Sequence, residues 1–334
     1  MATGVSEINL AWMRPYRLAG IALAVALVLP VVDLVLPNRW QLAGLMPGIF
    51  VFAILALGLN LVTGFTGLLN IGVAAFMAIG AYVYSILTSP VFPFQIGGWS
   101  ALVVTVASGA LAGVLLGLPA VRLRGDYLAI VTLGFGEIVQ DTLRNLEPLT
   151  KGSMGINPVP GLASPGLRTY YLYLLILVLA VVFCRNLRDS RIGRAWISIR
   201  EDELAARAMG IGTPRLKLAA FATCAALCAG GGGLWAGLQG TSVEPSSYDY
   251  TLSISVLCAV IVGGLGSISG VLLGALLMFG LNQIVLVKLT DAIGGGGRHV
   301  MAQPGNWKYL IFGVALVLMM RWRPEGLLPE RSDR

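Results

Sequence analysis

Long runs of apolar residues recur along this 334-residue chain and leave few ways for it to fold. Hydrophobic residues make up 57% of the sequence and charged residues only 12%, against about 25% charged residues in soluble domains. A helix of about 20 apolar residues is long enough to cross a bilayer. Because such a helix satisfies its own backbone hydrogen bonds in lipid, the sequence predicts an all-α polytopic membrane protein.

The apolar runs divide into about ten expected transmembrane helices in one domain, 1–334. Arg14 and Arg17 precede the first run and no convincing cleavage site follows it, so we expect an uncleaved first span. Three spans (the fifth, sixth and eighth) are short, which predicts broken, glycine-hinged helices around a cavity, because irregular backbone must be shielded from lipid. The expected spans are Leu18–Leu36, Leu42–Leu61, Leu68–Leu87, Trp99–Leu118, Tyr127–Val139, Tyr170–Phe183, Leu216–Leu238, Leu252–Gly264, Gly270–Val287 and Tyr309–Met320.

Positive charge is unevenly distributed between the loops. If the amino terminus is cytoplasmic and the spans alternate, 16 of the 23 Lys and Arg residues fall on the cytoplasmic side and 7 on the outer side. Cytoplasmic loops retain an excess of these residues, so the bias predicts an N-in/C-in orientation. The hairpins Val62–Gly67 and Leu265–Ser269 carry no charge and could be loops or re-entrant breaks.

The largest polar loop, 184–217, contains eight of the basic residues and a short expected helix. Acidic residues stand where this helix begins, the end that favours negative charge, and Gly210 is suited to end it. The helix either lies on lipid headgroups or docks in a groove of a cytoplasmic partner. Its small alanine face favours docking. The residues expected to couple to such a partner are Glu201, Asp202, Glu203, Ala205, Ala206, Arg207 and Gly210.

Glycine is abundant, with 43 residues, and is spaced in a pattern. Stripes at every fourth position let helix backbones approach closely, either inside one subunit or at a dimer face. Segments 60–80 and 260–280 also resemble each other weakly: each has a helix, a glycine hinge, a small polar residue and a second helix. Transporters built from duplicated halves place their pathway at the junction. The two stripes are Gly109, Gly113, Gly117 and Gly266, Gly270, Gly274.

Glu137 is the one acidic residue inside an expected span and away from an obvious end. A carboxylate in the bilayer is costly and faces a cavity or a partner, unless the span ends early and Glu137 reaches water. We expect Glu137 to face the bundle interior and to act in packing or gating rather than in proton transfer. The polar residues near the first hairpin could line a pathway or cap helix ends. The expected pathway and hinge residues are Asn60, Thr63, Gly64, Asn70, Gly134, Gly136, Glu137, Gly263, Gly264 and Gly266.

Several other classes of function are disfavoured. The phosphate loop of an ATPase requires a Gly-Lys dipeptide, which this sequence lacks, so ATP hydrolysis by this chain is not expected. No basic stripe on a soluble domain indicates nucleic-acid binding. The four cysteines lie in or beside apolar spans, and the single histidine, His299, lies in an outer loop. No metal or catalytic site is therefore expected.

Six segments together resemble the LivM-type permeases of branched-chain amino-acid ABC importers, and they cover the chain from about Gly58 to Pro329. Glu203, Ala205, Ala206 and Gly210 resemble the E-A-A-x-x-x-G pattern of the helix that enters the ATPase in ABC permeases, with Leu204 inserted. Lys151 stands where related permeases more usually have a small residue. The segments are GLNLVTGFTGLLNIGVAAFMAIGAY, RLRGDYLAIVTLGFGEIV, LTKGSMGI, GRAWISIREDELAARAMGI, VIVGGLGSISGVLLGA and WRPEGLLP.

The resemblance implies a multi-pass subunit of the bacterial inner (plasma) membrane. Its implied partners are a sister permease subunit, two cytoplasmic ATP-binding subunits and a periplasmic substrate-binding protein, with membrane lipid around it and no nucleic acid. ATP would be bound by the partner subunits, and this chain would hold no cofactor. Two alternatives stay open: a related permease for urea or short-chain amides, and an ion-coupled secondary transporter that uses Glu137 as proton carrier. A structural scaffold is disfavoured by the broken spans.

Overall fold

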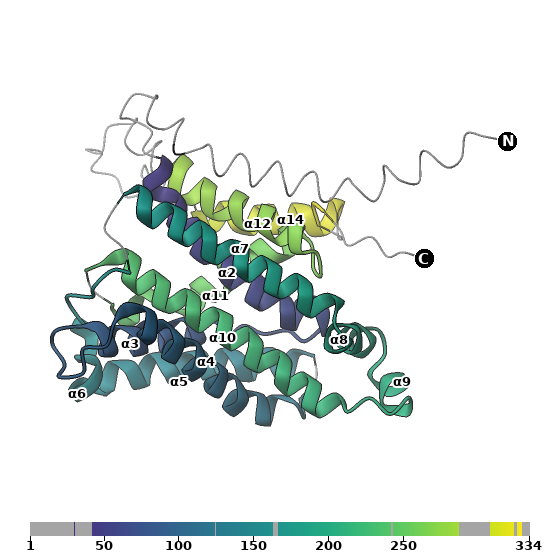
Figure 1. The fold of residues 1–334 in the computed structure, drawn as a ribbon. Coiled ribbons are helices and arrows are strands. Elements are labelled where there is room, and N and C mark those ends of the chain that lie inside the picture. The colour runs from purple at the N-terminus through teal and green to yellow at the C-terminus, as the bar shows by residue number, and fades with distance from the viewer. Residues whose placement is uncertain are drawn as a thin grey trace.

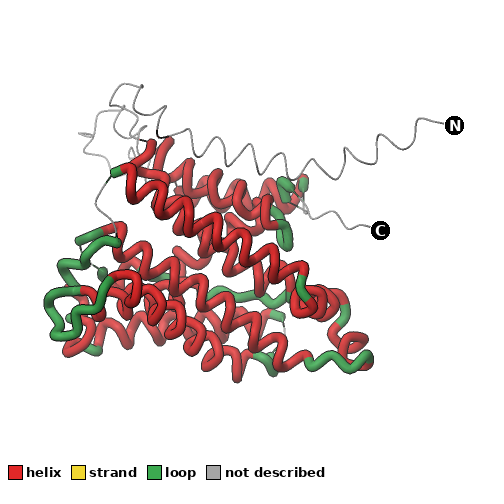
Figure 2. The backbone as a smooth tube through the Cα atoms, viewed as in Figure 1, coloured by secondary structure: helices red, strands yellow, loops and turns green. Residues whose placement is uncertain are grey.

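The structure, a computed structural model, describes residue 30 and residues 42–123, 125–162, 166–241, 243–286, 308–323 and 326–328. These residues form a bundle of helices whose long members run side by side (Figures 1 and 2). The β-structure found among them is one antiparallel bridge between Ile156 and Val243. The all-α, polytopic prediction is confirmed for this part of the chain. Apart from residue 30, the first expected span, Leu18–Leu36, lies outside the described residues, as does His299.

The described helices, in chain order, are α2 (Leu42–Asn60), the π-helical turn η1 (Leu61–Phe65), α3 (Val73–Thr88), α4 (Gly98–Ala120), α5 (Asp126–Asn145), α6 (Glu147–Thr150), the 3₁₀ turn η2 (Gly152–Met154), α7 (Leu167–Asp189), α8 (Arg191–Glu201), α9 (Glu203–Ala208), α10 (Thr213–Gln239), the 3₁₀ turn η3 (Pro245–Ser247), α11 (Tyr250–Gly263), α12 (Ile268–Gly280), the π-helical turn η4 (Leu281–Leu286) and α14 (Lys308–Trp322).

Within the described residues, five helical segments are long and apolar enough to cross a membrane, and two shorter apolar helices, Val73–Thr88 and Ile268–Gln283, accompany them. All seven correspond to expected spans, because a long apolar run is a strong signal for a buried or lipid-facing helix. The five long segments are Gly44–Phe65, Gly98–Ala120, Leu167–Asp189, Thr213–Gln239 and Pro245–Gly263.

Two spans expected to be short are full-length helices. α5 has 20 residues and α7 has 23, so the expected ends at Val139 and Phe183 were wrong. In both cases charged or polar residues end the apolar run without ending the helix, since Arg and Gln are good helix formers. α11 itself has 14 residues, but with the preceding turn η3 it forms the membrane-length segment Pro245–Gly263, so the eighth span is also longer than expected.

The break expected after the second span is present. Residues 66–72 form no helix, although most of them are buried. Side chains satisfy two of their backbone N–H groups: Thr132 Oγ1 of α5 accepts a hydrogen bond from Ile71 N at 3.0 Å, and Asn70 Oδ1 accepts one from Gly72 N at 2.9 Å. In the first turn of α3, Ala74 N donates to Ser253 Oγ at 2.9 Å. Non-helical backbone at membrane depth is tolerated when it is enclosed by protein in this way.

α10 is the central helix, and glycine lets its neighbours approach it. A Cβ at Gly109 would lie 2.3 Å from the Cβ of Ala229, and one at Gly113 would lie 2.6 Å from the Cβ of Ala225. The second stripe packs α12 on α11 in the same manner, with a Cβ at Gly274 only 2.1 Å from Ala259 O. The glycine stripes therefore serve packing inside one chain, one of the two alternatives that the sequence left open.

The connecting segments gather at the two ends of the bundle. α8 and α9 lie at one end and α6 lies at the other (Figure 1). At the α6 end, Ile156 pairs with Val243, and Gln140 Nε2 donates to Pro245 O at 2.9 Å. Segments expected on the outer side thus meet at one end, as alternating spans require.

We predict that Gly80→Ala destabilises the fold. An added Cβ would lie 2.0 Å from Ala229 O, a backbone atom of α10, and overpacking of this kind costs about 1–3 kcal/mol. The apparent Tm of the detergent-solubilised protein should fall. Gly44→Ala is the matched control, because its Cβ would meet nothing within 4 Å. Equal melting temperatures for both variants would contradict this account of α10 packing.

Candidate functional site: a helical loop joined to two hinges

The polar loop after α7 folds into two helices, beginning with α8. Ser190 caps α8, its Oγ accepting a hydrogen bond from Gly193 N at 3.2 Å. The side chain of Trp196 is fully buried, and its Nε1 donates to Leu216 O at 2.8 Å. Gly193 must be glycine, since a Cβ there would lie 2.2 Å from Arg188 O. These contacts fix α8 to α7 and to the start of α10.

α9 has capping interactions at both ends. Asp202 Oδ1 accepts hydrogen bonds from Leu204 N at 2.8 Å and Ala205 N at 3.1 Å, as an N-cap residue does. At the other end Gly210 has φ +83, and Ile211 N donates to Ala206 O at 3.1 Å, the pattern of a glycine-terminated helix. The expected helix start and end are confirmed, although Glu201 belongs to the last turn of α8.

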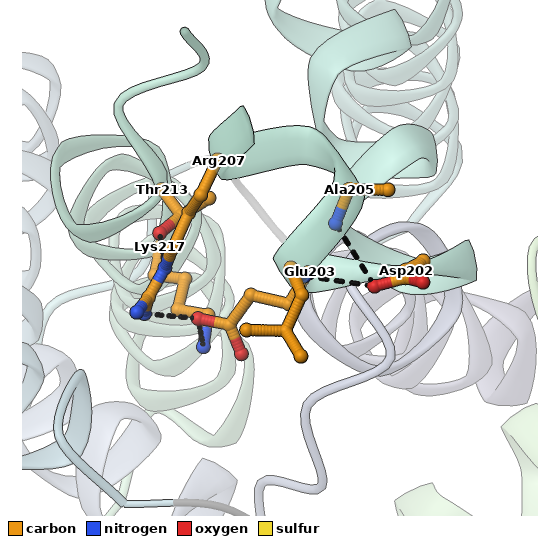
Figure 3. A network of polar contacts seen from close by, with 7 residues as sticks. Asp202, Glu203, Ala205, Arg207, Thr213 and Lys217 are labelled. Carbon is orange, nitrogen blue, oxygen red and sulfur yellow. Dashed lines mark hydrogen bonds and ion pairs between the residues drawn. The ribbon is translucent and has the colours of Figure 1, made fainter. Parts of the chain in front are cut away.

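A polar network holds α9 against α10 (Figure 3). Glu203 Oε1 accepts a hydrogen bond from Lys217 Nζ at 2.8 Å, and it also pairs with Arg207 Nη2. Arg207 Nε in turn donates to Thr213 Oγ1 at 2.8 Å. Lys217 is buried, with 2% of its side chain exposed, and a buried ammonium requires a partner of opposite charge. Glu203 therefore does more than favour a helix start: it neutralises a buried charge.

This network determines which side of α9 faces outward. Ala206 is buried against the chain, whereas Leu204 is 66% exposed and Met209 is 83% exposed. Ala205 and Ala208 are exposed beside them. Large apolar side chains on a clamped, exposed helix form a surface suited to a protein partner. Leu204 and Met209 belong to that surface, although they were not among the residues singled out for coupling.

The two glycine hinges, more than two hundred residues apart, lie in contact. Asn60 Oδ1 accepts a hydrogen bond from Gly266 N at 2.9 Å. There is no space beside Gly64, where a Cβ would lie 2.1 Å from Asn60 Oδ1 and 2.6 Å from Gly266 N. Gly264 and Gly266 have φ of +119 and +87, a backbone region that favours glycine. The sequence echo between 60–80 and 260–280 thus marks two breaks that meet.

Gly263 and the end of the described chain complete this contact. Gly263 packs on Gly270, since a Cβ added to Gly263 would lie 2.3 Å from Gly270 O. Gly263 O also accepts a hydrogen bond from Leu328 N at 3.2 Å. Thr63 Oγ1, inside η1, is buried and has no hydrogen-bond partner among the described residues. The hinge region therefore consists of tight backbone contacts around a buried hydroxyl.

Arg200 joins the α8–α9 loop to these hinges. Its Nη1 donates to Gly64 O at 2.6 Å, and a Cβ at Gly67 would lie 3.1 Å from its Cγ. Sequence reasoning missed Arg200. The available signal was its position four residues after Trp196, which places a charged side chain beside the buried face of α8.

The remaining expected pathway residues are dispersed. Asn70 is fully buried and its Oδ1 accepts a hydrogen bond from Gly72 N at 2.9 Å, so it supports the break. Glu137 is half-buried on α5, and α5 continues well past it. A Cβ at Gly134 or Gly136 would meet nothing within 4 Å. Gly134 and Glu137, three residues apart, share one face of α5, and the rest of the described chain covers that face only in part.

No group of three His, Cys, Asp or Glu that could hold a metal ion occurs among the described residues. The four cysteines are free and buried. The candidate site consists of α8, α9 and the two hinges.

We predict that Glu203→Ala destabilises the α9 end of the bundle. Removing one partner of a buried pair costs roughly 3–5 kcal/mol, and water near Glu203 reduces that cost. The double variant Glu203→Ala with Lys217→Met removes both charges and should recover most of the loss. Apparent Tm and protease cleavage within 203–212 measure the effect. Equal loss in the single and double variants would argue against the buried pair.

Comparisons with known proteins identify the family. The family described as "Branched-chain amino acid transport system / permease component" matches residues 42–320. The high-affinity branched-chain amino acid transport system permease protein LivM of Escherichia coli (strain K12) and that of Salmonella typhimurium (strain LT2) are each 39% identical to this chain over 308 residues, which cover 84% of this chain and 68% of each relative. No solved structure matches the chain. Because the family match extends from α2 into α14, this multi-pass membrane protein belongs to the permease components of branched-chain amino acid transport systems.

Proposed function

We propose that this chain forms half of the membrane pathway of an ABC importer and that ATP hydrolysis in separate subunits drives it through α9. The observation that carries the proposal is the exposed apolar surface of Leu204 and Met209 on a helix clamped by Glu203 and Lys217. A lipid-bound helix would have no need of that clamp, whereas a helix that transmits force must be fixed to the membrane bundle. The end that bears α8 and α9 faces the cytoplasm in this proposal.

The partners follow from this arrangement. A second permease subunit would complete the pathway, two ATP-binding subunits would receive α9 and its counterpart, and a periplasmic binding protein would deliver solute to the α6 end. The half-buried face of α5 that carries Gly134 and Glu137 is the proposed pathway side, because a carboxylate is costly against lipid. A bacterial inner membrane, N-in/C-in and about ten spans complete the proposal.

We propose branched-chain amino acids as the solute class. The family and both relatives carry that description, and the pathway side of α5 offers apolar surface, with Ile130 66% exposed. Urea or short-chain amides are the alternative for a related permease. Competition of leucine uptake by excess isoleucine, valine, urea and acetamide in the reconstituted importer separates the two: only the amino acids should compete.

We predict that Leu204→Asp and Met209→Asp abolish association with the ATP-binding subunits while the membrane fold persists. Each change places a charge on the apolar docking surface. Burying an unpaired carboxylate costs several kcal/mol, which is on the order of the free energy that holds the two subunits together. Co-purification of the ATP-binding subunits and the apparent Tm of the permease are the measurements.

The matched control for this prediction is Ser198→Asp. Ser198 is exposed on α8, in the same loop but outside the docking surface, and the charge introduced is identical. It should leave association unchanged. Full recovery of the complex in the Leu204 and Met209 variants would remove the docking role from α9.

We predict that Glu137→Gln largely preserves transport and that Glu137→Leu impairs it. Glutamine keeps the shape and hydrogen-bonding capacity of the side chain, while leucine removes the polar group from the proposed pathway. Uptake between pH 5.5 and 8 by the reconstituted importer measures both. If Glu137→Gln abolished uptake and removed a pH dependence seen in the wild type, the ion-coupled alternative would be favoured.

A further inference from the structure

We propose that Arg200 is a positioning residue that carries movement of α9 to the two contacting hinges, and so couples ATP hydrolysis to opening of the pathway. This inference rests on the proposed function, since it assumes that α9 receives an ATP-binding subunit. It assigns to Arg200 a role that differs from docking: Arg200 touches neither the docking surface nor the proposed pathway side of α5.

The first observation is the bond itself. Gly64 lies in η1, close to the end of a helical segment, where carbonyl groups lack partners from the following turn. Arg200 Nη1 donates to Gly64 O at 2.6 Å. A hydrogen bond from a guanidinium is stronger than one between neutral groups. It also joins residues 136 apart in sequence, so α8 and η1 are connected directly.

The second observation is the close fit around this bond. A Cβ at Gly67 would lie 3.1 Å from Arg200 Cγ, and one at Gly64 would overlap both Asn60 and Gly266. Gly67 itself has φ +70, a region that favours glycine. Arg200 is exposed overall, but its Cγ lies against Gly67 and its guanidinium binds Gly64 O, so a displacement of Arg200 acts on η1 through these two contacts.

The third observation is the stiffness of the connection on the α9 side. Trp196 is buried and hydrogen-bonded to Leu216 O, and Arg200 follows it one helical turn later on the same side of α8. Asp202, which caps α9, is two residues further on. We therefore expect α8 and α9 to move as one rigid unit, anchored at the start of α10 and carrying Arg200.

The second hinge extends the connection to α12. Asn60 directly precedes η1 and accepts the hydrogen bond of Gly266 N at 2.9 Å. Ser267 follows and caps α12, its Oγ accepting from Gly270 N at 3.1 Å. A shift of η1 therefore reaches the first turn of α12. Two breaks that move together are suited to switch a pathway, because packed elements with hinges change between discrete arrangements.

A purely structural role for Arg200 makes a different prediction. If Arg200 only stabilised the fold, its loss would lower the apparent Tm and reduce ATP hydrolysis and uptake in parallel. A coupling role predicts that ATP hydrolysis continues while uptake per ATP hydrolysed falls. The ratio of the two rates distinguishes these cases.

The experiment uses the complete importer, with its ATP-binding subunits and binding protein, in proteoliposomes supplied with leucine and ATP. Arg200→Met should lower leucine uptake per ATP hydrolysed by about tenfold or more, the factor expected for loss of a hydrogen bond from a charged group. Arg200→Lys keeps a charged donor and should recover part of the ratio. The matched control is Arg194→Met on the same helix, whose guanidinium donates locally to Asp189 O and whose ratio should equal that of the wild type.

A wild-type ratio in Arg200→Met, or a parallel loss of both rates that follows the loss of Tm, overturns the proposal. A second measurement needs no variant: hydrogen exchange of residues 61–67 in the wild-type importer, with and without a non-hydrolysable ATP analogue. The exchange should change on nucleotide binding. Unchanged exchange overturns the proposal even if Arg200→Met fails to assemble.

The outcome also separates this inference from the proposed function. If α9 is not the docking helix, the Leu204 and Met209 variants assemble and transport normally. If α9 docks but Arg200 does not couple, those variants lose the ATP-binding subunits while Arg200→Met keeps the wild-type ratio of uptake to hydrolysis.

Discussion

The fold depends on one constraint: every backbone N–H and C=O inside a bilayer needs a partner. Continuous helices satisfy it by themselves, which is why most of the described chain is helical. Where this chain departs from helix, at 66–72 and at 264–267, partners come from elsewhere. Thr132 of α5 supplies an oxygen to the first break, Ser253 of α11 supplies one to the first turn of α3 that follows it, and Asn60 supplies one to the second break. The breaks are tolerated because side chains from elsewhere in the bundle bind their backbone.

The same constraint explains the distribution of polar side chains. Many buried polar side chains in the described residues bind backbone groups: Asn70 accepts from Gly72 N, and Tyr173 Oη donates to Leu234 O at 2.7 Å. Polar residues inside the spans are therefore poor guides to the pathway when considered one at a time. The half-buried side of α5 is a better guide, since Glu137 stands there beside two glycines whose Cβ positions are open.

Helices and their caps were predictable from sequence for physical reasons. Apolar runs mark spans because lipid excludes polar side chains, and Asp202 and Gly210 mark the ends of α9 because capping is local chemistry. The lengths of α5 and α7 were not predictable, because charged residues end a hydrophobic run without ending a helix. The Arg200 contact was not predictable either. Its acceptor is a backbone carbonyl, and because every residue carries one, the residue type gives no signal. The Glu203–Lys217 pair was missed for a related reason: it spans the turn between two helices, where spacing alone indicates no neighbour.

The site combines two contacts that differ in the cost of breaking them: the Glu203–Lys217 pair and the hydrogen bond from Arg200 to Gly64 O. The Glu203–Lys217 pair lies between adjacent helices and includes a buried ammonium, so breaking it exposes an unpaired charge and is costly. The bond from Arg200 to Gly64 O involves a guanidinium that is exposed and can bind water when the bond breaks, so no charge is left buried without a partner. α9 is therefore held firmly to α10, while its link to the hinges can be released and remade. A transporter that alternates between two pathway states requires this difference in strength. The Glu203–Lys217 pair must persist through each cycle, whereas the hydrogen bond from Arg200 to Gly64 O must be able to break and re-form.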